Sequence, residues 1–198
     1  MSPLYGIVAC GGQSSRMGKD KSLLDYYGRP QRDYLYDMLG PLCEKVFISC
    51  SREQAAGVAP GYLLVTDEDR YEGIGPMASL LSALGKFPSA SFLVVGCDYP
   101  FVIKDHLQQL VAARAEKKDA VCFRNPETSF DEPLLAVYEN SIHPVLLENF
   151  RLKKYSLRHF LSEVSTHALT PASADFLKSI DDDEGYKKAR QALHPPFQ

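Results

Sequence analysis

A glycine-rich segment near the start of the chain carries the clearest chemical signal. The apolar residues 6–10 predict a buried strand, and Gly11 and Gly12 follow it directly. Paired glycines let backbone N–H groups approach a ligand closely, and successive amides of this kind bind anions such as phosphates. Arg16 and Lys21 add a planar guanidinium and a mobile ammonium group. The spacing fits neither a Walker A loop nor a dinucleotide fingerprint, so we predict a phosphate-binding loop of another type rather than a plain surface turn.

An isolated aspartate carries the second signal. Asp98 follows the apolar residues 92–96, where a buried carboxylate is costly unless it meets a cation or hydrogen-bond donors. Mg²⁺ would meet that need, because it favours one or two carboxylates together with phosphate oxygens and water. The same ligands suit Mn²⁺. An equally good interpretation is structural: Asp98 could cap a helix that begins near Ile103, or open a turn at Tyr99 and Pro100.

The acidic residues 181–184 precede the last predicted helix. The helix dipole favours acidic side chains in a first turn, so Asp183 is better interpreted as a helix cap than as a ligand. Asp181 follows the apolar Ile180 and could instead face the same metal ion as Asp98.

These residues need a framework that brings them together. Short runs rich in Val, Ile and Leu alternate with amphipathic segments, which predicts buried parallel strands between helices. The predicted class is α/β: a doubly wound, mostly parallel sheet in a three-layer α/β/α arrangement. Ligands of such sheets bind at the carboxyl ends of the strands, so the site should include the Gly11 loop, residues 49–51 and 67–69, and Asp98. The predicted strands cover residues 6–10, 46–50, 62–66, 92–96, 120–123 and 134–138, and the predicted helices cover 32–42, 77–84, 107–115, 142–150, 157–164 and 184–193.

Bulk composition limits the class of protein. The 198 residues are 45% hydrophobic and 24% charged, which fits a single folded domain over residues 1–198. The formal net charge of −3 argues against nucleic acid as the main partner, because phosphate-backbone binders carry a basic excess. Neither a membrane-spanning run nor a signal peptide is visible. Five scattered cysteines without a Cys-x-x-Cys pair indicate reduced core thiols, so we expect a cytoplasmic protein.

Four motifs together resemble the molybdenum cofactor guanylyltransferase family, within the wider group of Rossmann-like nucleotidyltransferases. The family's L-A-G-G-x-S-x-R-M-G-x-D-K is similar to residues 9–21, and its G-P-L-A-G is similar to residues 75–79. Its C-D-x-P-F matches residues 97–101, and its H-P-x-x-A resembles residues 132–136. The order and spacing of these motifs hold across almost the whole chain.

The resemblance implies a reaction and a division of the chain. The family moves GMP from GTP onto a molybdopterin-type phosphorylated acceptor with the help of Mg²⁺, and it releases pyrophosphate. A nucleotide-binding part of about residues 1–102 would precede an acceptor-binding part of about residues 103–198, both within one domain.

The resemblance also implies roles for individual residues. Asp67 would recognise guanine, because a carboxylate can accept hydrogen bonds from the N1 and N2 hydrogens of the base. Asp98 would bind Mg²⁺. Gly12 favours GTP, since the cytidylyl-transferring relatives tend to carry alanine there. The residues implied in catalysis are Arg16, Lys21 and Asp98. The residues implied in nucleotide binding are Cys10, Gly11, Gly12, Lys21, Ser51, Asp67 and Asp98.

This chain departs from the family pattern at three places. The family's late N-x-N is replaced, so that Asp181 offers the metal a second carboxylate in place of an amide. The asparagine expected after the second strand is Ser49 or Ser51, and Glu132 replaces a histidine near the expected acceptor. These changes leave the reaction class intact and leave the acceptor open.

Two other functions stay open. One is a related nucleotidyltransferase that uses CTP or another nucleotide on a different phosphorylated acceptor. The other is a non-catalytic adaptor that binds a nucleotide or a pterin. The sequence also leaves open whether a protein partner delivers the acceptor. The basic residues that could bind an acceptor, or form only a solvated patch, are Arg151, Lys153, Lys154 and Arg158.

Overall fold

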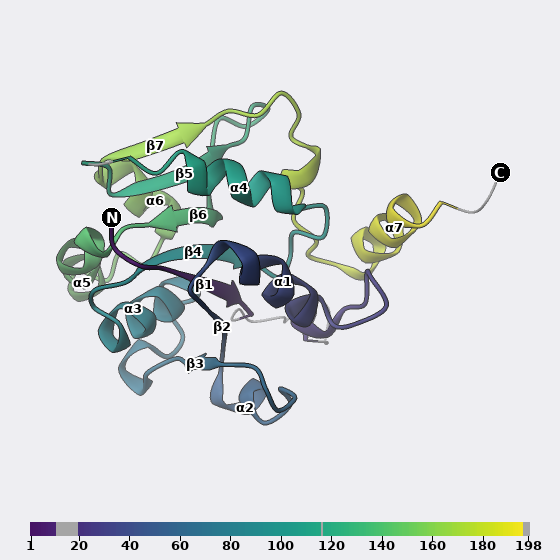
Figure 1. Cartoon of the computed structure of the whole chain (residues 1–198), viewed down its shortest axis with the longest axis horizontal. Coiled ribbons are helices and arrows are strands. Elements are labelled where there is room, and N and C mark those ends of the chain that lie inside the picture. Colours follow the sequence, from purple (N-terminus) through teal and green to yellow (C-terminus); the bar gives the residue numbers. More distant parts are fainter. Residues whose placement is uncertain (11–19, 116, 196–198) are drawn as a thin grey trace.

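A sheet of seven strands forms the middle layer of the molecule (Figure 1). The computed structural model describes residues 1–10, 20–115 and 117–195, so Gly11, Gly12 and Arg16 lie outside the described residues. The strand order is β3-β2-β1-β4-β6-β5-β7. The strands are β1 (Leu4–Ala9), β2 (Lys45–Cys50), β3 (Leu64–Thr66), β4 (Ser91–Gly96), β5 (Ala120–Arg124), β6 (Asp131–Tyr138) and β7 (Thr166–Leu169). The helices are α1 (Gln31–Leu39), α2 (Arg52–Ala55), α3 (Pro76–Lys86), α4 (Lys104–Ala112), α5 (His143–Arg151), α6 (Leu157–Glu163) and α7 (Asp183–Leu193).

The first four strands form the parallel part of the sheet. All six residues of β4 are buried, as expected for a strand that is covered on both faces. Ile7 of β1 is in register with Phe47 of β2 and with Val94 of β4. Since β1, β2, β3 and β4 run in one direction, they end at the same edge, which we call the carboxyl edge. The predicted doubly wound, mostly parallel sheet is confirmed.

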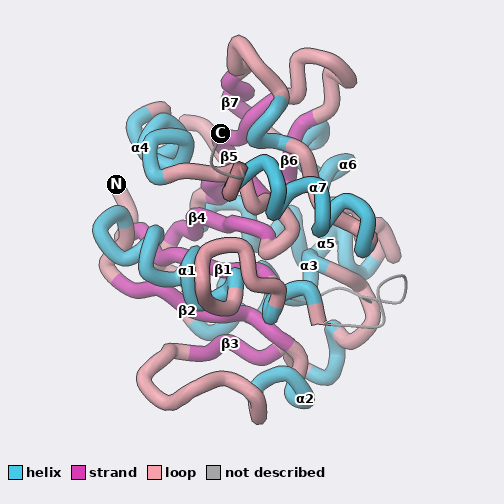
Figure 2. The backbone as a smooth tube through the Cα atoms, turned by 90° about the vertical axis from the view of Figure 1, so that its right-hand side faces the viewer, coloured by secondary structure: helices cyan, strands magenta, loops and turns pink. Residues whose placement is uncertain are grey.

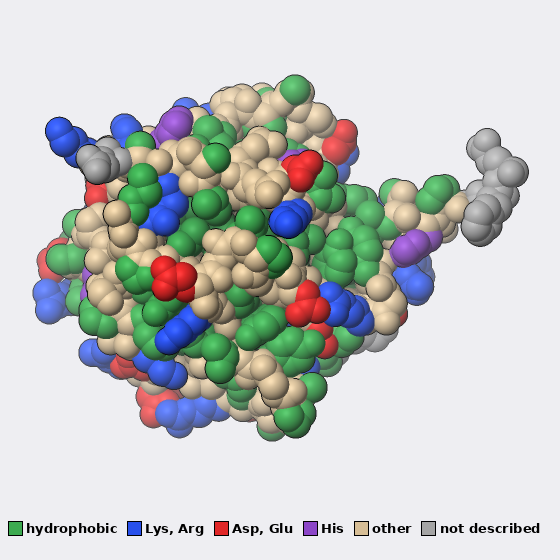
Figure 3. Space-filling model, viewed as in Figure 1, with side chains coloured by type: hydrophobic (Ala, Val, Ile, Leu, Met, Phe, Trp, Pro, Cys, Tyr) green, Lys and Arg blue, Asp and Glu red, His purple; other side chains and the backbone are tan. Residues whose placement is uncertain are grey.

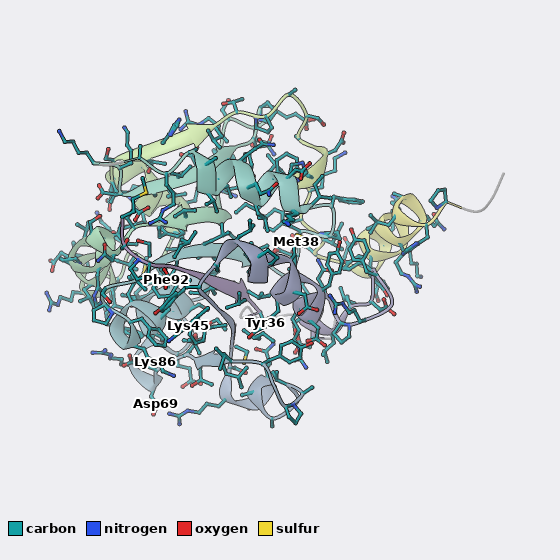
Figure 4. All side chains as sticks on the ribbon, in the orientation of Figure 1. Tyr36, Met38, Lys45, Asp69, Lys86 and Phe92 are labelled. Carbon is teal, nitrogen blue, oxygen red and sulfur yellow. The ribbon has the colours of Figure 1, made fainter. Side chains whose placement is uncertain are left out.

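Helices cover both faces of this sheet. Side chains alternate along the strands, so Ile7 packs in a core with α3, α5 and α6, whereas Val8 packs in a second core with α1 and α4. Phe92, labelled in Figure 4, lies in the first core, with its ring centroid 6.2 Å from that of Tyr5. The predicted three-layer arrangement is therefore confirmed.

Strand β6 brings the second half of the chain to the carboxyl edge. It pairs antiparallel with both β4 and β5, and Leu135 is in register with Val95 near the end of β4. The first residues of β6 therefore lie beside the segment that follows β4. This placement puts Glu132 close to Asp98, although 34 residues separate them in the chain.

Helix α7 stands apart from the two helical layers (Figure 1), and in Figure 2 it lies on the side that faces the viewer. Ile180 and Ala189 form a third small core with Leu24 and Tyr26. The hydroxyl of Tyr186 donates to the backbone oxygen of Asp25 at 3.0 Å. The last helix is thus fixed to the segment that precedes α1, and the residues before it are held near the carboxyl edge.

Two short elements and one helix cap differ from what the sequence predicts. Helix α2 has only four residues, and the residues of β7 are partly buried or exposed, so neither produces a clear apolar pattern. Asp182, and not Asp183, caps α7, because its carboxylate accepts from the N–H of Gly185 at 2.7 Å. The cap prediction was therefore wrong by one residue.

The surface seen in Figure 3 mixes acidic and basic side chains over the face that carries α1 and α4. Among the helices of the described residues, none is long and apolar enough to span a bilayer.

Candidate active site

Asp98 lies in the turn that follows β4. A Cβ at position 96 would collide with Oδ1 of Asp98 and would lie 3.2 Å from Cβ of Leu134. Glycine at this position therefore gives the carboxylate its place over the end of the strand. Helix α4 begins at Lys104 after Ile103, so Asp98 caps no helix and that interpretation of Asp98 was wrong. The interpretation as a turn residue was right, since the N–H of Tyr99 donates to Gly96 O at 3.4 Å.

The Asp98 carboxyl is held in an unfavourable environment for an anion. Its pKa is raised from the ordinary value to about 6, chiefly by burial. The charges of Asp181 and Glu132 act in the same direction, whereas a hydrogen bond from its own backbone N–H and the charge of Lys21 oppose the rise. Among the described residues, no other side chain donates a hydrogen bond to this carboxylate. A largely desolvated carboxylate whose one hydrogen bond comes from its own backbone N–H is a group whose charge a bound cation would stabilise.

A backbone hydrogen bond attaches the segment before α7 to this turn. The N–H of Ile180 donates to the carbonyl oxygen of Asp98 at 2.8 Å. The next residue, Asp181, forms an ion pair with Lys21, in which Nζ lies 2.5 Å from Oδ1. The structure thus brings together Lys21, Asp98 and Asp181, which are far apart in the sequence.

Asp67 occupies the same edge on the other side of β1. It follows β3, and its N–H donates to Cys50 O at 3.4 Å. Burial raises its pKa to about 6, while a hydrogen bond from Ser79, with Oγ 3.5 Å from Oδ1, opposes that rise. Three strand spacings of about 4.8 Å separate β3 from β4, which places the two aspartates on the order of 14 Å apart along the edge. A nucleotide that lay across this edge would meet one carboxylate near each end.

Gln54, a residue that the sequence did not single out, contacts both ends of the glycine-rich loop. Its side-chain amide donates to the backbone oxygen of Cys10 at 3.3 Å and to Oδ2 of Asp20 at 3.0 Å. Its amide oxygen accepts from the N–H of Ser51 at 3.0 Å, and its own N–H donates to Ser51 Oγ at 3.2 Å. Ser51, a predicted nucleotide ligand, is thus the cap of α2. The S-x-x-Q pattern of residues 51–54 is a capping-box signal that could have pointed to Gln54.

A second group of polar and aromatic residues flanks Asp98 on the β6 side. The hydroxyl of Tyr99 donates to Oε2 of the buried Glu132 at 3.0 Å, and a guanidinium nitrogen of Arg158 lies 3.9 Å from the same oxygen. The Arg158 guanidinium also lies 5.0 Å from the ring centroid of Phe130, an exposed aromatic residue. Arg158 therefore offsets the negative charge that Glu132 adds near the site.

The other basic residues that the sequence singled out lie apart from this group. Arg151 forms an ion pair with Glu148 at 3.3 Å, and Lys154 forms one with Glu163 at 2.9 Å. These pairs lie on the surface at α5 and α6. Arg158 alone of these residues contacts the group around Glu132.

The oxygen ligands that the structure provides suit Mg²⁺. Asp98 and Asp181 offer two carboxylates at one place, and the Asp98 carboxylate receives no hydrogen bond from another side chain of the described residues. No cluster of three or more His, Cys, Asp or Glu side chains that could hold a metal alone occurs in residues 1–10, 20–115 and 117–195. Two carboxylates without a full protein cage are what Mg²⁺ uses when phosphate oxygens and water complete its shell.

The fold and these residues define an α/β protein with a nucleotide-type site at the carboxyl edge of a parallel sheet. The chain belongs to the MobA-like NTP transferase domain family, whose model matches residues 6–169.

Known proteins similar to this chain agree with that assignment. It is 39% identical over 137 residues to a molybdenum cofactor biosynthesis bifunctional protein of Synechocystis sp., a match that covers 69% of this chain but only 39% of that relative. It is 28% identical over 176 residues to a molybdenum cofactor guanylyltransferase of Pseudomonas putida, covering 88% of this chain and 91% of the relative. The structure of molybdopterin-guanine dinucleotide biosynthesis protein A from Archaeoglobus fulgidus has a TM-score of 0.76 at 21% identity, and the match covers 95% of this chain and 97% of that one.

Proposed function

We propose that this protein is a molybdenum cofactor guanylyltransferase. It transfers GMP from GTP to the phosphate of a molybdopterin-type acceptor and releases pyrophosphate. The observation that carries this proposal is the assembly of Lys21, Asp98 and Asp181 at the carboxyl edge. The names of the similar proteins support the choice of nucleotide and acceptor.

The reaction is an in-line attack by the acceptor phosphate on the α-phosphorus of GTP. Lys21 leaves Asp181 and contacts the triphosphate, where its charge stabilises the transition state. Arg16 contributes a second cation to the triphosphate. Asp98 and Asp181 would hold Mg²⁺ (or Mn²⁺), which supplies positive charge to the reacting phosphates when it is bound. Because no covalent enzyme intermediate is needed, catalysis consists of positioning and charge neutralisation.

The two halves of the chain divide the substrates between them. Residues of about 1–102 bind the nucleotide, with Cys10, Gly11 and Gly12 along its phosphates and base. Asp67 accepts hydrogen bonds from the guanine edge, since its carboxyl is half-buried and already lies beside Ser79. The position of β6 supports this division, because β6 brings the proposed acceptor half of about residues 103–198 against the end of β4.

Acceptor binding uses the group around Glu132. The exposed ring of Phe130 offers a flat surface to a pterin, and Arg158 offers a cation to its phosphate. Truncation of Arg158 to alanine is expected to raise KM for the acceptor while the Kd for GTP stays unchanged. Arg151→Ala, which removes a surface arginine outside this group, is the matched control.

Calorimetric titration with GTP, CTP, ATP and UTP in the presence of Mg²⁺ tests the choice of nucleotide. Selective binding of GTP is expected, and a preference for CTP would favour the related nucleotidyltransferase with another acceptor. Release of pyrophosphate on addition of the acceptor tests turnover. Tight GTP binding without pyrophosphate release would indicate the non-catalytic adaptor instead. We place this reaction in the cytoplasm, and a protein partner that delivers the acceptor would fit the open acceptor side.

A further inference from the structure

Two thiols lie side by side at the carboxyl edge. Cys10 directly follows β1 and Cys97 directly follows β4, and these strands are adjacent and parallel (Figure 1). Their Sγ atoms are 3.1 Å apart. The N–H of Cys97 donates to Ala9 O at 3.2 Å, which continues the strand pairing to these residues. The two thiols therefore lie on a rigid framework and not on independent loops.

We propose that Cys10 and Cys97 form a reversible oxidation site, in which a hydroperoxide converts the two thiols to a disulfide that disables the nucleotide site. Adjacent strands lie about 4.8 Å apart, which is within the Cα separation of about 4.4–6.8 Å that disulfides span. Closing the bond needs the two sulfurs to approach from 3.1 Å to about 2.05 Å. Small side-chain rotations can supply this movement.

Burial and exposure give the two thiols different parts in the reaction. Cys10 is partly exposed, whereas Cys97 is buried. The sulfur of Cys10 attacks the hydroperoxide, so an S–O bond forms and the O–O bond breaks. The leaving oxygen takes the Cys10 proton and departs as an alcohol or water. The sulfur of Cys97 then attacks the Cys10 sulfenic acid, forming the S–S bond and releasing water with the Cys97 proton. The thiols lose two electrons and the hydroperoxide gains them.

The remaining three cysteines are poor candidates for this reaction. Burial raises the pKa of Cys43 and of Cys122 to about 12 and that of Cys50 to about 11, which keeps these thiols protonated. Burial also raises the pKa of Cys97 well above its usual value. Cys97 reacts in spite of this, because its partner sulfur is already in contact and no diffusion is needed.

The position of the pair connects oxidation to the nucleotide site. The carbonyl oxygen of Cys10 accepts the hydrogen bond from Gln54, and Asp98 immediately follows Cys97. A covalent link between the pair would pull the start of the glycine-rich loop and the metal carboxylate toward each other. Only this effect rests on the proposed function; the formation of the disulfide does not.

Peptide mapping of the oxidised whole protein tests the proposal. Reduced protein is treated with hydrogen peroxide, alkylated in denaturant and digested with trypsin without reductant. A cross-linked pair of peptides, residues 1–16 and 87–104, is expected, and the number of titratable thiols should fall from the five free cysteines to three. Thiol loss without this peptide pair, or a bond from Cys10 to Cys50, would overturn the proposal.

Nucleotide binding gives the second readout on the same samples. Oxidised protein should lose GTP binding and recover it after treatment with dithiothreitol. Cys97→Ser should not form the peptide pair, whereas Cys122→Ser should form it as the wild type does. A disulfide that leaves GTP binding unchanged would refute the link to the site. Absence of GTP binding in the reduced protein would instead refute the proposed function, and the peptide map would still decide whether the disulfide forms.

Discussion

The ammonium group of Lys21 and the carboxylate of Asp181 are 2.5 Å apart, although 160 positions separate them in the chain. The Lys21 side chain is 22% exposed and that of Asp181 is 53% exposed. An ion pair this open to solvent contributes only about 0–1 kcal/mol to stability. The ion pair lies beside Asp98, which indicates a functional role. When a nucleotide and a metal ion bind, the pair opens, so that Lys21 can contact the phosphates and Asp181 can bind the metal ion.

We therefore expect Lys21→Ala to lose activity with little loss of stability. A contact between a charged group and phosphate is worth about 1.5–3 kcal/mol, so kcat/KM should fall roughly 10- to 100-fold. The midpoint of urea unfolding should stay close to that of the wild type. Lys178→Ala is the control, because Lys178 forms a surface pair of similar length with Asp175, at 2.6 Å. Equal activity of Lys21→Ala and wild type would remove Lys21 from the site.

Asp98→Asn should produce an inactive protein that is more stable than the wild type at pH 7 without metal. Burial raises the folded-state pKa of Asp98 to about 6 from its ordinary value of 3.8. The folded state therefore holds the proton more tightly, and the ionised group destabilises the fold once the pH rises above about 4. This cost grows until about pH 6 and is then constant, on the order of 1–3 kcal/mol. Asparagine mimics the neutral acid and therefore removes this destabilisation.

Urea unfolding of both proteins between pH 4 and pH 8 measures this difference. The two curves of unfolding free energy should converge near pH 4 and separate between pH 4 and pH 6. Added Mg²⁺ should stabilise the wild type more than Asp98→Asn, because the variant keeps only the Asp181 carboxylate for the ion. A constant difference over the whole pH range would mean that the charge of Asp98 is not the cause.

Gln54→Ala should weaken nucleotide binding although Gln54 lies outside the motifs of the chain. The change removes the two donors that hold Cys10 O and Asp20 on either side of the glycine-rich loop. Each hydrogen bond is worth about 1 kcal/mol, so KM for GTP should rise roughly 5- to 30-fold with a smaller change in kcat. Gln54→Glu should be worse, since it places a carboxylate against two acceptors. Glu53→Ala, on the exposed side of the same helix, should behave as wild type.

The sequence predicts the framework better than the details of the site. Buried strands such as β4 carry a continuous apolar signal, and the residues that follow them must meet at one edge. That reasoning places Asp67 and Asp98 at the edge where the structure has them. The role of Gln54 depends on long-range hydrogen bonds to Cys10 and Asp20, and the Lys21 contact with Asp181 depends on how α7 packs. Neither contact has a local pattern, so the sequence alone does not predict them.

Asp67 should decide which base is accepted. Its carboxyl is half-buried beside Ser79, and partial burial raises its pKa to about 6. At pH 7.5 the group is ionised and can accept two hydrogens from guanine, whereas cytosine presents an acceptor at the matching position. Asp67→Asn should therefore weaken GTP binding about 10- to 100-fold, because a hydrogen bond to a charged group is worth about 1.5–3 kcal/mol. Binding of CTP should change much less.

Competition between GTP and CTP in calorimetric titrations measures this change in selectivity. Asp69→Ala is the control, since Asp69, labelled in Figure 4, lies two residues away at the surface and pairs with Arg52. Wild-type GTP binding should also weaken as the pH falls through about 6, because the protonated carboxyl accepts one hydrogen fewer. In Asp67→Asn this part of the pH dependence should disappear. A variant that keeps both its selectivity and its pH dependence would show that guanine is read elsewhere.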